Sequence, residues 1–258
     1  VGDGVGVLTC YSINEGKKQW SFQTENHIIG TPAIDDNIIV FGSADNNIYA
    51  LNTRNGNLLW KIAADEPVLG AVSIEKGTAY IGASDHTFRA IDIKTGKIKW
   101  VYTGIKGYIE TRPWVGDNKV IFGAWDNTLY ALDKITGKVI WKWTGGLTRM
   151  HFSPAAVWPV ATDGKVFIVD PQRAMTAIDI ETGKTIWRTY QSKVRETIGI
   201  SEDNERIYAK TMNDSIVCFS SKENEPIQLW ASNVGFGYEF APSMLIEKEN
   251  VVFGSTKN

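Results

Sequence analysis

Three glutamates and one histidine fall at one equivalent position of a repeated segment in this 258-residue chain. The position lies three residues before the proline of a Gly-Thr-Pro segment at residues 30–32, or before its counterpart in each repeat. We assign to it Ile29, Val68, Glu110, His151, Glu196 and Glu239. Arginines lie close by in sequence, at Arg112, Arg149 and Arg195. Such groups could bind a partner, hold a cation or line a hydrated channel.

Loops between the second and third predicted strands carry a second set of polar and aromatic residues: Asp45, Asp85, Trp125, Asp126, Arg173 and Lys257. We expect the three aspartates to bond to the backbone of their own loops. A calcium site would need six or more oxygens, more than these carboxylates supply without backbone and water. We predict no catalytic residue and no metal ligand. The candidate binding residues, named here the loop rim, are Glu110, Arg112, Trp125, Arg149, His151, Arg173, Glu196 and Glu239.

The fourth repeat differs most from the others because its loops are longer, and insertions in repeat arrays tend to mark the binding surface. Trp143, Met150, His151, Phe152 and Trp158 gather there. Aromatic residues and methionine suit a protein interface, and they equally suit packing beneath a longer loop. The chain has three histidines, and none has a metal-ligand partner at helical or hairpin spacing.

The elements that position these residues follow from a tryptophan repeat. Trp20, Trp60, Trp100, Trp141, Trp187 and Trp230 are spaced 40, 40, 41, 46 and 43 residues apart. This period is typical of β-propellers, in which each repeat is a four-stranded blade. Residues 28–62 contain four short apolar segments separated by turn signals, and glycines such as Gly56 suit hairpin turns because they adopt positive φ. We interpret the six tryptophans as structural docking residues between neighbouring blades.

Each end of the chain supplies half a repeat, with two outer strands in residues 5–22 and two inner strands in residues 238–255. We therefore predict an all-β, six-bladed β-propeller of four-stranded antiparallel blades. One blade is shared by the N- and C-terminal segments, and residues 1–258 form a single, monomeric domain. The alternative is that the chain is part of a larger ring.

Composition excludes several classes of protein. The hydrophobic fraction is 43%, the charged fraction 22% and the net charge −2, so nothing indicates a nucleic-acid-binding surface. No apolar run approaches the ~18 residues of a membrane-spanning helix. The first ten residues lack the features of a signal peptide and there is no initiator methionine, so we expect a processed chain. Cys10 and Cys218 occupy positions where other repeats carry alanine, which favours small buried residues over a redox pair.

The motif Ala-x-Asp-x-x-Thr-Gly-Lys-x-x-Trp is complete at residues 90–100, 131–141 and 177–187, and looser at 50–60. It resembles the tryptophan-docking repeat of pyrroloquinoline-quinone (PQQ)-like propellers over nearly the whole chain. The resemblance implies either a quinone-dependent dehydrogenase or a cofactor-free propeller, similar to the BamB-type outer-membrane assembly lipoproteins or to propellers attached to phosphoesterases and kinases. The dehydrogenases hold PQQ between a tryptophan and a vicinal disulfide, with calcium and an aspartate base. Cys10 and Cys218 cannot form a vicinal pair, and no matching calcium-binding set is evident.

We therefore predict a non-catalytic binding or scaffolding propeller, BamB-like, that recognises a protein, peptide or glycan through the loop rim. It uses no cofactor, binds no nucleic acid, does not insert into a membrane, and is periplasmic or extracellular. The alternative is a PQQ- and calcium-dependent alcohol or sugar dehydrogenase. The opposite rim, named here the turn rim, carries the Thr-Gly-Lys turns at Lys97, Lys138 and Lys184 and repeats almost unchanged. We expect binding at the loop rim because it differs at every repeat.

Overall fold

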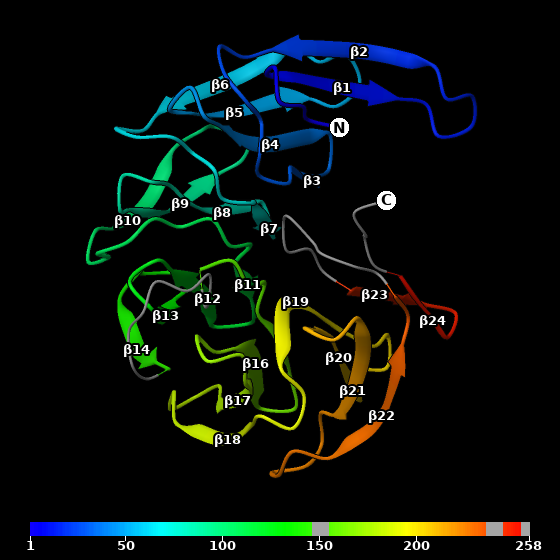
Figure 1. Cartoon of the computed structure of the whole chain (residues 1–258). Coiled ribbons are helices and arrows are strands. Elements are labelled where there is room, and N and C mark those ends of the chain that lie inside the picture. Colours follow the sequence, from blue (N-terminus) through cyan, green and yellow to red (C-terminus); the bar gives the residue numbers. More distant parts are fainter. Residues whose placement is uncertain (146–154, 236–244, 254–258) are drawn as a thin grey trace. The chain divides into compact units, whose positions relative to one another are not determined.

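A computed structural model describes residues 1–145, 155–235 and 245–253 of the chain (Figure 1). All of the regular secondary structure within these ranges is β-strand, as the repeat predicts. The chain divides into two compact units by its internal contacts. The first comprises Val1–Val120 with Leu132–Lys138, and the second comprises Ile121–Ala131 with Val139–Asn258. The expectation of a single domain over residues 1–258 stays a prediction.

The first unit begins with a two-stranded antiparallel sheet and continues with two four-stranded antiparallel sheets, each in sequential strand order. The two-stranded sheet is β1 (Val7–Tyr11) and β2 (Lys18–Gln23). The next contains β3 (Ala33–Asp35), β4 (Ile38–Ser43), β5 (Asn47–Asn52) and β6 (Leu58–Ala63). The third contains β7 (Ser73–Glu75), β8 (Thr78–Gly82), β9 (Phe88–Asp92) and β10 (Ile98–Tyr102).

A further four-stranded sheet has residues in both units and contains β11 (Trp114–Val115), β12 (Lys119–Ala124), β13 (Thr128–Asp133) and β14 (Val139–Thr144). The second unit then forms β15 (Val160–Thr162), β16 (Lys165–Val169), β17 (Met175–Asp179) and β18 (Thr185–Thr189). A six-stranded sheet follows, built from β19 (Val194–Ile200), β20 (Arg206–Thr211), β21 (Ser215–Ser220), β22 (Gln228–Asn233), β23 (Leu245–Lys248) and β24 (Val251–Phe253).

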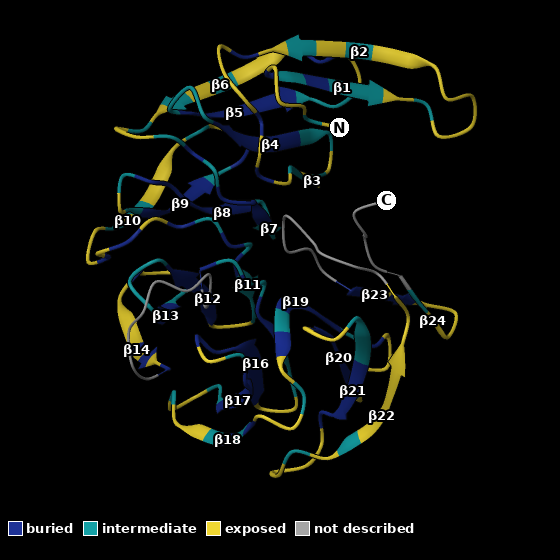
Figure 2. Ribbon diagram, viewed as in Figure 1, coloured by how far each residue is buried: buried dark blue, intermediate teal, exposed yellow. Residues whose placement is uncertain are grey.

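In the four-stranded sheets the second and third strands are the most buried, and the fourth strands are more exposed than they are (Figure 2). In the first unit, Val40 and Ile48 on the β3–β6 sheet share a core cluster with Ile81 and Ile91 on the β7–β10 sheet. A strand covered on both faces carries apolar residues in succession rather than in alternation. This explains runs such as the five buried residues of β8.

One contact recurs between the fourth strand of one sheet and a turn of the next. The indole N–H of Trp60 donates to the carbonyl of Ile93 at 2.7 Å, and its ring lies so close to Gly96 that a Cβ there would stand 2.9 Å from it. The turn glycine has φ +70°, which an L side chain rarely adopts. Three other pairs repeat the geometry: Trp20 with Thr53 and Gly56, Trp100 with Lys134 and Gly137, and Trp141 with Ile180 and Gly183.

The other residues of the repeated motif shape the turn and the strand that the tryptophan contacts. Asp92 accepts hydrogen bonds from the backbone of Lys94 and Thr95 and from the Thr95 hydroxyl, which closes the turn. Ala90 lies opposite Trp100 across the β9–β10 pair, and its small side chain leaves room for the indole. The lysine that follows the glycine is exposed. The recurring alanine, aspartate, threonine, glycine and tryptophan of the motif thus each have a packing or hydrogen-bonding role.

Cysteine replaces alanine opposite two of the tryptophans. Cys10 pairs with Trp20, and Cys218 pairs with Trp230, in the register that Ala90 and Trp100 take. Burial raises the pKa of the Cys218 thiol to about 12, so the thiol is neutral at ordinary pH. Both cysteines are free thiols.

The half-repeats at the two ends form two strands each, as predicted, but the described residues do not join them in one sheet. β1 and β2 pair only with each other, whereas β23 pairs in parallel with β19 within the six-stranded sheet. Gly199 permits this pairing, because the carbonyl of Leu245 occupies the space that a side chain at residue 199 would need. Because β1–β2 and β23–β24 belong to different units, the expected blade shared by the two ends stays a prediction.

Aspartates before the third strands bond to their own loops, as predicted. Asp85 accepts from the backbone of Thr87 at 3.1 Å and from its hydroxyl at 2.7 Å, and it pairs with the Arg89 guanidinium. It also accepts from the backbone of Asp65 at 3.3 Å, which ties the preceding loop to this turn. Burial raises the pKa of Asp85, but the bonds from Arg89 and Thr87 outweigh it, and the pKa lies below its ordinary value.

Gly183→Ala should destabilise the protein more than Gly164→Ala. The two glycines have nearly equal φ, +71° and +73°, so the backbone strain is matched. A Cβ at residue 183 meets the Trp141 ring at 2.7 Å, whereas nothing lies within 4 Å at residue 164. We expect an extra cost of about 1–3 kcal/mol for Gly183→Ala, measured by urea unfolding. Equal losses in the two variants would contradict the ring contact.

Stability should fall in acid through Asp85. Because its pKa is lowered on folding, its contribution is fully present above the unfolded pKa of about 4 and is lost as the pH falls through the folded value. Asp85→Asn should cost about 1–3 kcal/mol at neutral pH, and the gap to the wild type should narrow toward pH 2. Unfolding titrations at several pH values measure this, with Asp117→Asn, an exposed site, as the control. A gap that is independent of pH would count against the assignment.

Candidate functional site

In the first unit, Glu110 and Arg112 lie on the segment that leads into β11. Ile109 and Thr111 in the same segment are fully buried, whereas Glu110 and Arg112 are half-buried. Because successive side chains of an extended segment alternate in direction, the glutamate and the arginine face the same side. Burial lowers the pKa of Arg112, although a guanidinium stays charged at neutral pH.

The structure corrects the alignment of one repeat. Ile109 packs against Gly82, and Val68 packs in the same way against Gly42. Val68 is therefore equivalent to Ile109, and its assignment to the position of Glu110 was wrong by one residue. The second repeat has no proline at the reference point, so the sequence offered no marker there. The burial of Val68 follows from this register, since it covers a glycine of the neighbouring strand.

An aromatic pair that sequence reasoning missed lies near these residues along the chain. His86, in the turn between β8 and β9, stacks on Tyr108, in the loop before β11, with ring centroids 5.4 Å apart and planes at 20°. Both side chains are exposed, and Tyr108 is 52% accessible. His86 has φ +62°, at a turn position where neighbouring repeats carry Asn46 and Asn127. Asparagine tolerates positive φ well, so a histidine at this turn position was the feature of the sequence that could have pointed to the pair.

In the second unit, Arg173 and Glu196 form an ion pair. The guanidinium lies 2.6 Å from the carboxylate, which is almost fully buried on β19. Arg173 sits in the turn between β16 and β17 with φ +69°, a left-handed conformation for a long side chain. Its backbone carbonyl accepts from Val194, so the turn is also tied to β19 through the main chain. The structure thus brings two loop-rim residues into direct contact.

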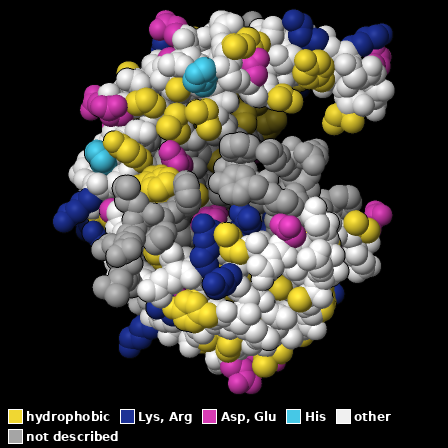
Figure 3. Space-filling view, viewed as in Figure 1, with side chains coloured by type: hydrophobic (Ala, Val, Ile, Leu, Met, Phe, Trp, Pro, Cys, Tyr) yellow, Lys and Arg dark blue, Asp and Glu magenta, His cyan; other side chains and the backbone are white. Residues whose placement is uncertain are grey.

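A second ion pair stabilises the turn that carries Arg173. Asp170 is buried and pairs with Arg188, and its carboxylate also accepts from the backbone of Gln172 and Ala174. Arg188 lies over the ring of Tyr190, whose hydroxyl donates to Gln172 at 2.7 Å. Figure 3 shows Lys and Arg side chains gathered beside β19 on the face in view. Asp170 is paired with Arg188, and Glu196 with Arg173. Charges that are paired in this way suit recognition by hydrogen bonding more than proton transfer.

The remaining loop-rim residues are only partly described. Trp125 is half-buried in the turn between β12 and β13. Arg149, His151 and Glu239 lie outside the described residues, as do Lys257, Met150 and Phe152. Of the aromatic residues of the fourth repeat, Trp143 is buried and donates to the Thr185 hydroxyl at 2.8 Å, which favours packing over binding for that residue.

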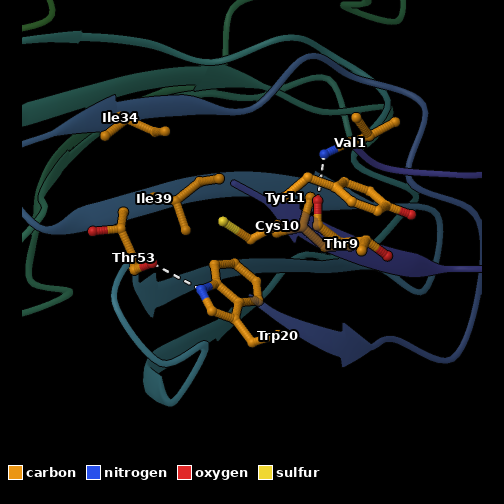
Figure 4. Close-up of a pocket in the computed structure, with 9 residues that line it drawn as sticks. Val1, Thr9, Cys10, Tyr11, Trp20, Ile34, Ile39 and Thr53 are labelled. Atoms are coloured by element: carbon orange, nitrogen blue, oxygen red, sulfur yellow. Dashed lines mark hydrogen bonds between the residues drawn. The ribbon is translucent and has the colours of Figure 1, made fainter. Parts of the chain in front are cut away.

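An apolar pocket of about 280 Å³ lies beside β1 in the first unit (Figure 4). Trp20, Cys10, Ile34 and Ile39 contribute to its lining. In the next sheet the space beside β5 is filled by β4, where Val40 pairs with Ala50, the counterpart of Cys10. The pocket is therefore a gap beside a two-stranded half-unit rather than a site lined for polar chemistry.

Across the three described ranges, no group of three or more histidine, cysteine, aspartate or glutamate residues is placed to hold a metal ion. In the same part of the chain, no helix has the length and apolar character needed to cross a membrane.

Comparisons with known proteins relate this geometry to a family. The family model described as outer membrane protein assembly factor BamB matches residues 3–223. The crystal structure of BamB from Moraxella catarrhalis is 22% identical with a TM-score of 0.70, covering 90% of this chain and 69% of that chain. The computationally designed protein Ika8 is 21% identical with a TM-score of 0.81, covering 97% and 75%. Among curated proteins, no sequence matches the chain.

At these identities the solved structures show the fold alone. They confirm the expected class, an all-β protein of four-stranded antiparallel repeats of the propeller type. The family model spans far more than half of the sequence and agrees with the resemblance that the tryptophan motif carries. The chain belongs to the family of the outer membrane protein assembly factor BamB, whose members carry PQQ-like repeats.

Proposed function

We propose that the chain is a non-catalytic binding or scaffolding protein of the cell envelope that recognises a protein partner through loop-rim surfaces. The description of its family as an assembly factor for outer membrane proteins supports both the class of partner and the compartment. The repeated tryptophan contact supports it as well, because this contact assigns a structural role to the side of each sheet that carries the Thr-Gly-Lys turns.

The observation that carries the proposal is the exposed stack of His86 on Tyr108. The pair has no part in tryptophan docking, and it exposes an aromatic face next to charged residues of the same segment, Glu110 and Arg112. Tyrosine and arginine are enriched at the energetic centres of protein interfaces, because each combines a large contact area with hydrogen-bonding capacity. An exposed aromatic pair held by a strained turn favours recognition over packing.

The second unit supports the proposal with a surface of different chemistry. Arg173 keeps about a quarter of its side chain accessible while it pairs with Glu196. The ion pair holds the guanidinium in place, so a partner carboxylate or carbonyl would meet a donor that is already ordered. Trp125, Arg149, His151 and Glu239 remain proposed members of the loop rim.

The dehydrogenase alternative fits the described residues poorly. A quinone site of that type needs adjacent cysteines, whereas Cys10 lies on β1 and Cys218 is buried on β21 as a free thiol. The acidic residues near the loops are also engaged, with Asp85 on Arg89, Asp170 on Arg188 and Glu196 on Arg173. These carboxylates are therefore already engaged in ion pairs within the structure. A binding role agrees better with this arrangement than a quinone and calcium site does.

Site-specific photocrosslinking tests which surface binds. A photoreactive phenylalanine analogue replaces Tyr108 in one variant and Ile135, exposed in a Thr-Gly-Lys turn, in the matched control. Irradiation in an envelope extract of the producing cells should yield a discrete protein adduct with the first variant only. Adducts from the residue 135 variant alone, or no protein adduct at residue 108, would contradict the proposal; a carbohydrate adduct would identify a glycan instead.

Affinity for the captured protein should depend on the aromatic pair. His86→Ala combined with Tyr108→Ala should raise Kd about thirtyfold, because two interface anchors of about 1 kcal/mol each are lost. Both side chains are exposed, so the unfolding midpoint should change little. Isothermal titration measures the affinity, with Lys97→Ala and Lys138→Ala as the turn-rim controls. Unchanged affinity in the aromatic variant and a loss in the lysine controls would place the surface on the opposite side.

The quinone alternative has its own test. The protein is mixed with PQQ and calcium, and the absorbance of bound quinone and dye-linked alcohol or sugar oxidation are recorded. We expect neither a stoichiometric complex nor turnover, because the two cysteines cannot form the adjacent pair of that site. A one-to-one complex that turns over would replace the binding role with a dehydrogenase.

A further inference from the structure

The turn between β5 and β6 differs from the other docking turns in its chemistry. Residues 52–57 read Asn-Thr-Arg-Asn-Gly-Asn, whereas the complete motif has aspartate at the first of these positions and threonine at the fourth. Asn55-Gly56 is the one Asn-Gly pair of the sequence. Asn55 is exposed and Gly56 is buried. A side-chain amide therefore stands in water directly before a glycine that lies beneath a tryptophan ring.

An asparagine that precedes glycine can lose its side-chain amide without an enzyme. The backbone nitrogen of the glycine gives its proton to a base in the solvent and attacks the side-chain carbonyl carbon of the asparagine. A five-membered succinimide closes and ammonia leaves. Water then opens the ring at either carbonyl, which gives aspartate or isoaspartate. Glycine favours the attack because it has no side chain to hinder the approach.

The side chain of Asn55 is already folded toward the reacting nitrogen. Its Oδ1 accepts a hydrogen bond from the backbone of Asn57 at 3.0 Å, which is the arrangement of an Asx turn. This bond encloses the peptide unit of Gly56, so the side-chain carbonyl lies beside the Gly56 nitrogen. The threonine of the other docking turns has no carbonyl carbon in its side chain and cannot form a succinimide.

The Gly56 nitrogen, in contrast, is protected by the docked turn. Its N–H donates to the carbonyl of Asn52 at 2.8 Å. The Trp20 ring covers the glycine so closely that a Cβ built at residue 56 would stand 2.7 Å from it. A nitrogen that is hydrogen-bonded and covered in this way is kept from the solvent base that must remove its proton.

Two contacts keep the ring over the glycine. The indole N–H of Trp20 donates to the carbonyl of Thr53 at 2.8 Å. Phe22, also on β2, packs edge-on against Phe41 and Tyr49, with ring centroids 6.5 and 5.6 Å apart. All of these residues belong to the first unit. Trp20 is only half-buried, and local openings of such a contact are far less costly than unfolding of the whole unit.

We propose that Asn55 is a site of spontaneous deamidation whose rate is set by the docking of Trp20. The docked turn protects the residue, and each local opening of the contact exposes the Gly56 nitrogen to the solvent. Isoaspartate lengthens the backbone by one carbon and adds a negative charge, so the product turn no longer holds its glycine and its carbonyl where the indole needs them. The reaction therefore makes the undocking of Trp20 permanent and loosens the β1–β2 sheet from the β3–β6 sheet.

Peptide mapping by mass spectrometry tests the proposal. The folded protein is incubated in mildly alkaline buffer, and conversion of Asn55 to aspartate and isoaspartate is followed. Trp20→Ala should react about tenfold faster than the wild type, because the protected state is no longer favoured. Trp100→Ala removes the same kind of contact at the Gly137 turn, so it is the matched control and should leave the rate at residue 55 unchanged.

Three further readouts identify the reaction and its consequence. Isoaspartate should accompany aspartate, and the rate should rise with pH because the attacking nitrogen must lose its proton. Hydrogen exchange of the Gly56 amide should accelerate in Trp20→Ala together with deamidation, since both need the same opening. Asn55→Thr, which supplies the residue of the other turns, should keep its unfolding midpoint during prolonged incubation, whereas the midpoint of the wild type should fall.

Several results would overturn the proposal. Equal rates in the wild type and Trp20→Ala, or a wild-type rate equal to that of a synthetic peptide of residues 50–60, would show that docking gives no protection. Equal acceleration in Trp100→Ala would assign the reaction to global unfolding, and aspartate without isoaspartate would exclude the succinimide. Circular dichroism establishes that each variant is folded. Trp20→Phe keeps a ring and loses the N–H, so it should react at an intermediate rate.

Discussion

The packing of a tryptophan ring on a turn glycine is the interaction on which the rest of this structure depends. The ring comes close enough to Gly56, Gly96, Gly137 and Gly183 that a side chain at these positions would overlap it. Each glycine also needs positive φ, so sterics and backbone conformation select the same residue. The hydrogen bond from the indole then fixes the ring against the carbonyl of that turn. One short motif therefore sets both the turn and the spacing between sheets.

Departures from the motif show what the contact contributes. Trp187 is buried between Phe167 and Phe219, but its indole N–H has no partner among the described residues. The turn that should receive it, near Lys222, has no Thr-Gly pair. The ring thus packs against two aromatic rings without the indole hydrogen bond of the other docked tryptophans. A buried N–H without a partner lowers stability, so this contact lacks the contribution that the indole hydrogen bond makes in the other four.

Structural and variable residues occupy different ends of the strands. The Thr-Gly-Lys turns are nearly alike because each must receive a tryptophan. The loops at the other ends keep an aspartate that closes the turn, as Asp85 does, and vary elsewhere. His86 and Arg173 are held at positive φ in two of these loops. Strain of this kind is tolerated where the surrounding hydrogen bonds determine the backbone, and it is common at binding surfaces.

The sequence alone determined the all-β class, the repeat length and the role of the turn glycines, because these depend on local spacing and on backbone conformation. It also located Asp85 as a loop cap, since such bonds span two residues. Tertiary structure decided which residues meet across the sheets: the pairing of Arg173 with Glu196 and the stack of His86 on Tyr108 join segments that are over 20 residues apart. It likewise decided the register of Val68 and the partner of β23, because packing against a glycine, not sequence order, sets those contacts.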